Sequence, residues 1–125
     1  AMGRAFRPEE DRVPGRDAVT VISHDLWKSQ FHSAPDAVGR KVRLNGIEFT
    51  VIGVTPEQFT GMHQLIRPAF YVPAHMFPAL TPGRANILED RAIRAFEVKG
   101  RLKPGVTIEA AQADLQSIAT GLSQQ

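Results

Sequence analysis

The sequence predicts an α+β fold, with a mixed, mainly antiparallel sheet built on one β-hairpin and two main helices. Three observations support this prediction. Residues 40–54 hold two β-rich runs around an Asn-Gly pair, residues 18–31 read as a strand followed by a capped helix, and residues 107–122 repeat apolar side chains at helical spacing. With 125 residues, the chain is long enough for one domain or for two small lobes that share a core.

The hairpin is the most specific local signal in the sequence. An Asn-Gly pair favours a type I′ turn, because both residues tolerate positive φ. The turn then sets a register in which Val42 faces Phe49 on an apolar side, while Arg43 lies opposite Glu48 and predicts a cross-strand ion pair. The alternation stops at residues 51–52, which are both apolar, and this indicates a bulge or a strand end buried on both sides.

The residues before the hairpin predict a lead-in, a strand and a helix. Residues 3–17 are rich in charges, proline and glycine, and we expect them to form an irregular, partly ordered lead-in. The two residues ahead of them are interpreted as a cloning remnant, so the chain is expected to be a fragment. Residues 18–22 predict a short buried strand, and Ser23 supplies the N-cap of a helix that reaches about residue 32.

The residues after the hairpin predict two further strands and a final helix. Residues 69–72 favour a strand, Pro73 can open a short helix, and residues 81–92 favour a surface loop. Residues 95–103 alternate strictly and predict a strand, and Thr107 caps the last helix. The apolar stripe of that helix comprises Ile108, Ala111, Leu115, Ile118 and Leu122. The predicted core comprises Trp27, Phe31, Val42, Leu44, Ile47, Phe49, Phe96, Leu115 and Ile118.

The composition argues against several classes of protein. The net charge of +2 is too small an excess to indicate nucleic acid, and no basic run is interleaved with aromatic residues. The absence of cysteine excludes a disulfide scaffold and a thiolate metal site. The glycines form no phosphate-binding pattern. We therefore predict no cofactor and no nucleic-acid partner.

No motif in the sequence predicts catalysis or metal binding. Ser23-His24-Asp25 contains the residue types of a catalytic triad, but adjacent helical residues point to different sides, and capping explains Ser23 and Asp25 better. The histidines show no i, i+4 pair of a zinc helix. We predict no catalytic residue and no metal site, and a hydrolase that uses the histidines is kept as an alternative. These histidines are His24, His32, His63 and His75.

Two groups of residues are candidates for a partner surface. Lys99, Arg101 and Lys103 share one face of the predicted strand, which is either a solvated face or a contact for a protein or for anionic headgroups. Phe59 and Met62 lie in a predicted loop, where they either pack into the core or form a docking surface. An alternative of another class is a small-ligand-binding sensor with a pocket lined by Phe59, Met62 and Tyr71.

The strand–helix–hairpin segment and a later stretch together resemble a known family. The segments that carry the resemblance are VISHDLWKSQF from residue 21, VGRKVRLNGIEFTVIGVTPEQFTG from residue 38 and FEVKGRLKPGVT from residue 96. They resemble the MacB-like periplasmic core domain of ABC-transporter permeases of the MacB/FtsX type. Gln58 departs from the pattern, since a glycine is expected between the Pro-Glu and Phe of this loop.

The resemblance implies a two-lobed, extracytoplasmic, non-enzymatic domain of a bacterial inner-membrane protein. Residues 3–80 would be the small α/β insertion lobe, and residues 95–122 a strand and helix of a porter-like βαβ lobe. The implied partners are the parent's transmembrane helices and a cognate ATP-binding domain or subunit, with a periplasmic protein or a second permease copy as further candidates. The implied task is to couple the motion of the membrane helices to a substrate or partner.

Overall fold

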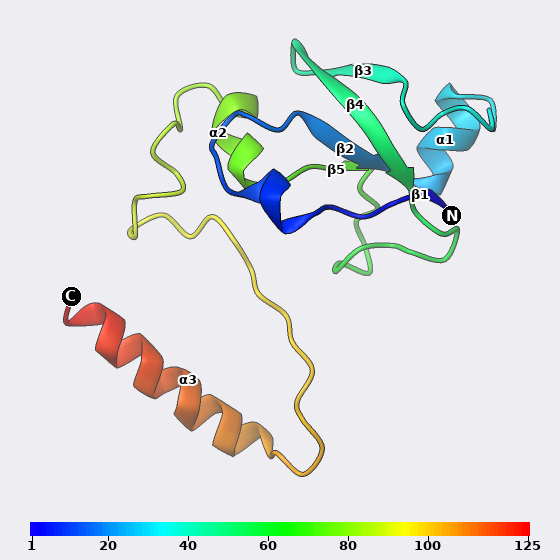
Figure 1. Cartoon of the computed structure of the whole chain (residues 1–125). Coiled ribbons are helices and arrows are strands. Elements are labelled where there is room, and N and C mark those ends of the chain that lie inside the picture. Colours follow the sequence, from blue (N-terminus) through cyan, green and yellow to red (C-terminus); the bar gives the residue numbers. More distant parts are fainter. The chain divides into compact units, whose positions relative to one another are not determined.

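The computed structural model describes residues 1–125, which divide into two compact units (Figure 1). Unit 1 is Ala1–Ala95 and unit 2 is Phe96–Gln125. Unit 1 contains every strand, so the fold is α+β as predicted. The elements in chain order are β1 (Met2–Gly3), the 3₁₀ helix η1 (Pro8–Asp11), β2 (Val19–Ile22), α1 (His24–Gln30), β3 (Lys41–Leu44), β4 (Ile47–Val54), β5 (Phe70–Tyr71), the 3₁₀ helix η2 (Ala74–Met76), α2 (Phe77–Leu80) and α3 (Ile108–Ser123).

The sheet has five strands, and β4 is its centre. β3 and β1 pair antiparallel with successive parts of β4, while β2 pairs with it in parallel and β5 extends the sheet beyond β2. Because β2 and β1 both pair at residues 53–54, they must lie on opposite edges of β4. The last residues of β4, from Val51 to Val54, are all buried. β4 is therefore held along both edges, which stiffens the middle of unit 1.

The Asn-Gly hairpin is confirmed. Asn45 and Gly46 have φ values of 51° and 82°, as a type I′ turn requires, and Val42 pairs with Phe49 in the predicted register. The ion pair differs from the prediction, because Lys41 Nζ lies 3.1 Å from Glu48 Oε1. Both side chains are more than half exposed, so this diagonal pair contributes little to stability.

The alternation of polar and apolar residues in β4 stops for both of the predicted reasons, a bulge and burial on both sides. β2 pairs Thr20 with Val51 and then Val21 with Gly53, so Ile52 is the extra residue of a bulge. The strand around the bulge is also buried on both sides. The bulge therefore sits where β1, β4 and β2 run side by side.

The lead-in is more ordered than predicted, because Met2 and Gly3 form β1. Gly3 has a φ of 71°, and a Cβ built there would lie 2.1 Å from the Ile52 carbonyl oxygen. A Cβ at Gly53 would lie 2.5 Å from the Arg4 carbonyl oxygen. Two glycines thus allow the backbones of β1 and β4 to approach, and this short strand at the start of the partly ordered lead-in was not predicted.

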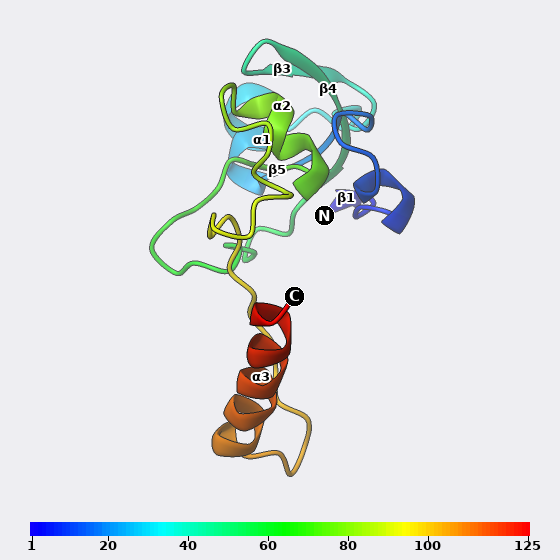
Figure 2. The ribbon, with the colours of Figure 1, turned by 90° about the vertical axis from the view of Figure 1, so that its left-hand side faces the viewer.

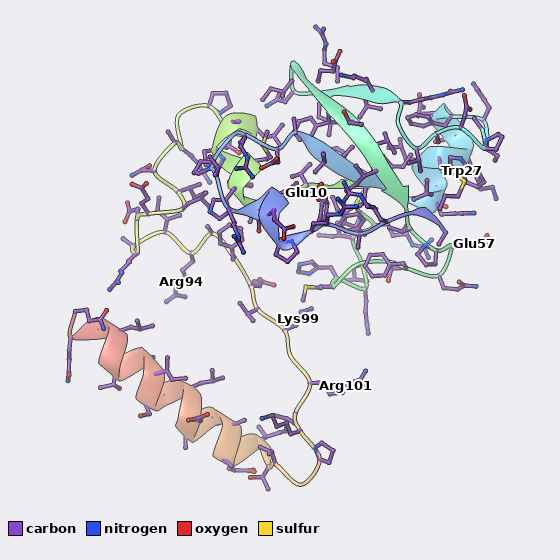
Figure 3. All side chains as sticks on the ribbon, in the orientation of Figure 1. Glu10, Trp27, Glu57, Arg94, Lys99 and Arg101 are labelled. Atoms are coloured by element: carbon purple, nitrogen blue, oxygen red, sulfur yellow. The ribbon has the colours of Figure 1, made fainter.

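A bidentate ion pair folds the rest of the lead-in back on itself. Arg4 Nη2 and Nη1 donate to the two Glu10 carboxylate oxygens over 2.6 and 3.0 Å, and the Arg7 backbone N–H donates to Glu10 Oε2 over 2.9 Å. These bonds, led by those from Arg4, lower the pKa of Glu10 to about 2. Figure 3 shows Glu10 at the 3₁₀ helix η1, away from α1.

The Glu10→Gln variant is expected to lose about 1 kcal/mol of unfolding free energy at neutral pH, because the amide keeps an acceptor oxygen but loses the charge that strengthens the bonds from the partly exposed Arg4. The folded pKa lies below the ordinary value of 4.5, so this stabilisation is present above pH 4.5 and fades as the pH falls towards 2. Urea unfolding at neutral and at acidic pH measures both effects. Glu9→Gln, on the exposed neighbouring residue, is the control. A pH dependence that is equal in the wild type and in Glu10→Gln would contradict the assignment.

α1 covers one side of the sheet, as its cap and spacing predict. Ser23 Oγ accepts a hydrogen bond from the Leu26 backbone N–H over 3.0 Å, which confirms the N-cap. Leu26, Trp27 and Phe31 pack, half-buried, against a cluster of Ile22, Val51 and Val54. The helix ends at Gln30, slightly earlier than predicted. Figure 2 shows α1 and η1 on opposite sides of β4.

The fully buried core of unit 1 differs from the predicted one and includes most of the second half of β4. Phe49 is fully buried, whereas the other predicted core residues of this unit, Trp27, Phe31, Val42, Leu44 and Ile47, are half-buried. The buried threonines have hydrogen-bond partners, since Thr20 Oγ1 donates to the Tyr71 carbonyl oxygen and Thr55 Oγ1 accepts from the His24 backbone N–H. Ile87 is buried within the predicted surface loop.

Unit 2 contains a helix but no strand, so the predicted strand at residues 95–103 is wrong. Thr107 caps α3 as predicted, with its side chain accepting from the Ala110 backbone N–H over 3.1 Å. Phe96, Leu115 and Ile118 were predicted in the core, yet each is more than half exposed. Alternation predicts which face of a strand would be buried, but a strand forms only where another strand supplies hydrogen bonds.

Candidate functional site

The loop between β4 and β5, residues 55–69, carries the largest group of exposed apolar side chains in unit 1. Phe59 and Met62 are 51% and 54% exposed, and they are joined by Leu65 at 98% and Ile66 at 63%. Met62 and Phe59 are two of the residues that were predicted from the sequence as candidates for a partner surface. The structure places them in one loop, outside the core of β4.

The base of this loop is fixed to the sheet. The rings of Phe59 and Tyr71 meet edge to face with centroids 5.6 Å apart, and the Ser23 backbone N–H donates to the Ala69 carbonyl oxygen over 2.8 Å. Gly61 has a φ of 77°, and a Cβ there would lie 3.1 Å from the Tyr71 hydroxyl oxygen. The loop therefore leaves the sheet from a defined base, and the exposed side chains of residues 62–66 lie beyond it.

A hollow of about 300 Å³ lies between the start of α1 and this loop. Its polar lining includes Ser23, His24 and Asp25, whose residue types match those of a catalytic triad. They do not assemble as one: Ser23 Oγ caps the helix, Asp25 lies 3.9 Å from Arg67, and the buried Nδ1 of His24 has no hydrogen-bond partner. Capping is thus the observed role of Ser23.

A second hollow, of about 380 Å³, is also lined by Phe59 and is mostly apolar. Phe59 and Tyr71 line it together with Met2, Val21 and Val54, and burial raises the pKa of Tyr71. Met62, the third residue of the predicted ligand pocket, is not part of its wall. The hollow thus brings together two of the three residues predicted for a ligand pocket.

The basic residues of the proposed surface lie in unit 2. Lys99, Arg101 and Lys103 are exposed along an extended segment without strand pairing, and Figure 3 shows Lys99 and Arg101 pointing outward from it. The polar and apolar residues alternate in the sequence here, but no strand forms, so the basic side chains do not share a strand face. The structure therefore does not bring the basic residues and the loop residues into one unit.

The histidines lie apart, and no group of three or more His, Cys, Asp or Glu side chains could hold a metal ion. His75 makes the contact that sequence reasoning missed: its ring Nδ1 and its backbone N–H lie 2.9 and 2.8 Å from Asp11 Oδ1. Burial favours a higher pKa for Asp11, but the bonds from His75 outweigh it and the pKa is lowered. The partners are 64 residues apart, and no local pattern indicates such a pair.

Comparisons with known proteins assign the chain to a family. The family model of the MacB-like periplasmic core domain matches residues 1–118, nearly the whole chain. No curated protein matches the sequence. No helix has both the length and the apolar character needed to span a membrane.

Proposed function

Because the chain belongs to the MacB-like periplasmic core domain family, we propose that it is a non-enzymatic coupling module, which passes the motion of membrane helices to a substrate or partner. Domains of this family are extracytoplasmic parts of ABC-type permeases at the bacterial inner membrane, and they work with transmembrane parts and an ABC transporter system. The match over residues 1–118 is the observation that carries the proposal.

The construction of unit 1 supports a mechanical task. A module that transmits motion must move as a body, and this favours a packed core with paired strands over a reactive pocket. β4 has partners on both edges, and the glycines at positions 3 and 53 let β1 lie close against it. The β4–β5 loop is anchored to this body through Tyr71, so a displacement of the sheet would displace the loop too.

The lobes and partners of this proposal follow the family. Residues 3–80 are proposed as the small α/β lobe, and residues 95–122 as a piece of the porter-like lobe whose further strands would pair with the extended segment. The partners are proposed to be the parent's transmembrane helices and a cognate ATP-binding subunit, with a periplasmic protein or second permease copy engaged outside the membrane. The small-ligand sensor stays a prediction, supported by the hollow beside Phe59 and Tyr71.

A flexible insertion between the units is expected to uncouple transport from ATP hydrolysis. Four residues, Gly-Ser-Gly-Ser, inserted after Ala95 in the parent permease lengthen the link at the boundary between unit 1 and unit 2, and a longer flexible link transmits displacement poorly. We expect transport to fall by about tenfold while ATP hydrolysis persists. Transport and ATPase rates of the parent in vesicles measure this.

The matched control is the same insertion after Gly83, in an exposed turn with open space around it. It is expected to leave both rates near the wild-type values. Full transport by the insertion after Ala95 would contradict the coupling proposal.

A further inference from the structure

The hollow of about 300 Å³ beside the start of α1 has two walls from different parts of unit 1. The first wall is the cap and first turns of α1, and the second is formed by both ends of the β4–β5 loop. The Ser23 backbone N–H donates to the Ala69 carbonyl oxygen over 2.8 Å, which ties the two walls together. The His24 backbone N–H also donates to Thr55 Oγ1 over 3.2 Å, directly after β4. The hollow is therefore preformed, and its volume lies at the lower end of the range for ligand sites.

The carboxylates and the guanidinium that line the hollow leave one negative charge unbalanced. Asp25 and Glu57 contribute two carboxylates, and Arg67 contributes one guanidinium. Asp25 and Arg67 lie 3.9 Å apart and form a long, solvated pair. Glu57, which Figure 3 shows at the start of the β4–β5 loop, is exposed and forms no ion pair. A ligand that carries one positive charge would complement the charge of these walls.

The same hollow offers apolar surface and an unpaired polar atom. Phe59 is 51% exposed, and Leu26 and Pro68 add to the apolar lining. An aromatic ring attracts a cation through its face and also covers apolar carbon. In the wall formed by α1, the buried Nδ1 of His24 has no hydrogen-bond partner, and a neutral imidazole can accept a hydrogen bond at such a nitrogen. A ligand with N–H donors and an apolar body would match both features.

We propose that this hollow binds a small organic cation, an ammonium group carried on an apolar body of about the size of one aromatic ring. The ammonium group pairs with Glu57, and the apolar body packs against Phe59. An anion with the same body is excluded, because it would meet two carboxylates. The site lies within unit 1 alone, so the inference goes beyond the coupling function and does not rest on it.

Three probes that share one aromatic ring and differ in their head group test the proposal: benzylamine, benzyl alcohol and benzoate. Each is titrated into the ¹⁵N-labelled chain to about 10 mM, because ligands of this size bind weakly. We expect benzylamine to shift the backbone N–H resonances of the residues that line the hollow. Benzyl alcohol should bind about fivefold more weakly, because it lacks the charge, and benzoate should cause no shift there.

Two variants with opposite expected effects identify the charges responsible. Glu57→Gln is expected to weaken benzylamine binding by about threefold to fivefold, the worth of a partly solvated ion pair. Arg67→Gln is expected to tighten it by about twofold, because a like charge is removed and Asp25 loses its competing partner. Glu48→Gln, which removes an exposed carboxylate outside the hollow, is the control and should leave binding unchanged. All three positions are exposed, so the fold is expected to tolerate the changes.

Three outcomes would overturn the proposal: no benzylamine-dependent shift at the hollow, equal affinity for benzylamine and benzyl alcohol, or weaker benzylamine binding by Arg67→Gln. The second would show that only the apolar lining binds, and the third that the guanidinium itself contacts the ligand. Transport by the variant with the insertion after Ala95 is measured in the parent permease and does not depend on benzylamine binding. This proposal and the coupling proposal therefore fail separately.

Discussion

The Phe49→Ala variant is expected to lose about 3–5 kcal/mol of unfolding free energy, the range for deleting a buried phenylalanine ring. Phe49 is fully buried in the middle of β4, where it faces Val42 across the hairpin. β4 pairs with three strands, so the cavity cannot close without moving backbone that is held on both edges. For a unit of this size, the midpoint of thermal unfolding should fall by about 12 °C or more.

Fluorescence from Trp27, the only tryptophan, measures this loss, because its ring packs against the core cluster. Phe96→Ala makes the same chemical change at a side chain that is 54% exposed, and unfolding of unit 1 should change by about 0.5 kcal/mol or less. Leu44→Ala, at a half-buried site, should fall between the two. Equal midpoints for Phe49→Ala and Phe96→Ala would show that the centre of the core is misplaced.

Features encoded by a few neighbouring residues could be predicted from the sequence. The turn at Asn45 and the caps at Ser23 and Thr107 each depend on one side chain or on a backbone preference, so their signal is local. The register of β3 against β4 follows from the turn. These local features were enough to identify the fold class and the family.

Contacts between distant segments were missed. β1 needs two glycines that lie 50 positions apart in the chain, Gly3 and Gly53, and neither has a distinctive sequence context. The same holds for Asp11 and His75, and for Arg67 beside Asp25. In the candidate site, Phe59 and Met62 are exposed, and Phe59 contacts Tyr71, the residue with which the predicted ligand pocket grouped it.

No strand forms at residues 95–103, although one was predicted there. The physical reason also applies to the basic partner surface that was predicted on this strand. Alternating apolar residues such as Phe96 and Val98 indicate a face to be buried, yet they supply neither the covering layer nor the hydrogen-bonding neighbour. Within unit 2 there is only α3 to pack against, and its own apolar stripe is exposed. In unit 2 the alternating segment therefore has no neighbouring strand and no covered face.

Replacing Asn45-Gly46 by Val-Val is expected to cost about 2–4 kcal/mol, because each β-branched residue is forced into a left-handed conformation that costs about 1–2 kcal/mol or more. The native φ values of 51° and 82° leave no alternative that keeps the two-residue turn. A longer loop would shift the register, and a shift of one residue would turn Phe49 towards solvent. Urea unfolding, followed by Trp27 fluorescence, measures the loss.

Asn45→Gly separates the turn from a second role of this side chain. Asn45 Nδ2 donates to the Leu80 carbonyl oxygen over 2.6 Å, and this bond is lost in both variants. Glycine keeps access to positive φ, so Asn45→Gly should cost only about 1 kcal/mol, the worth of one exposed hydrogen bond plus chain entropy. If Val-Val is no less stable than Asn45→Gly, the bond to Leu80 and not the backbone conformation holds the hairpin. If Val-Val is much less stable, the left-handed turn is what orders β3 and β4 and thereby places the base of the β4–β5 loop.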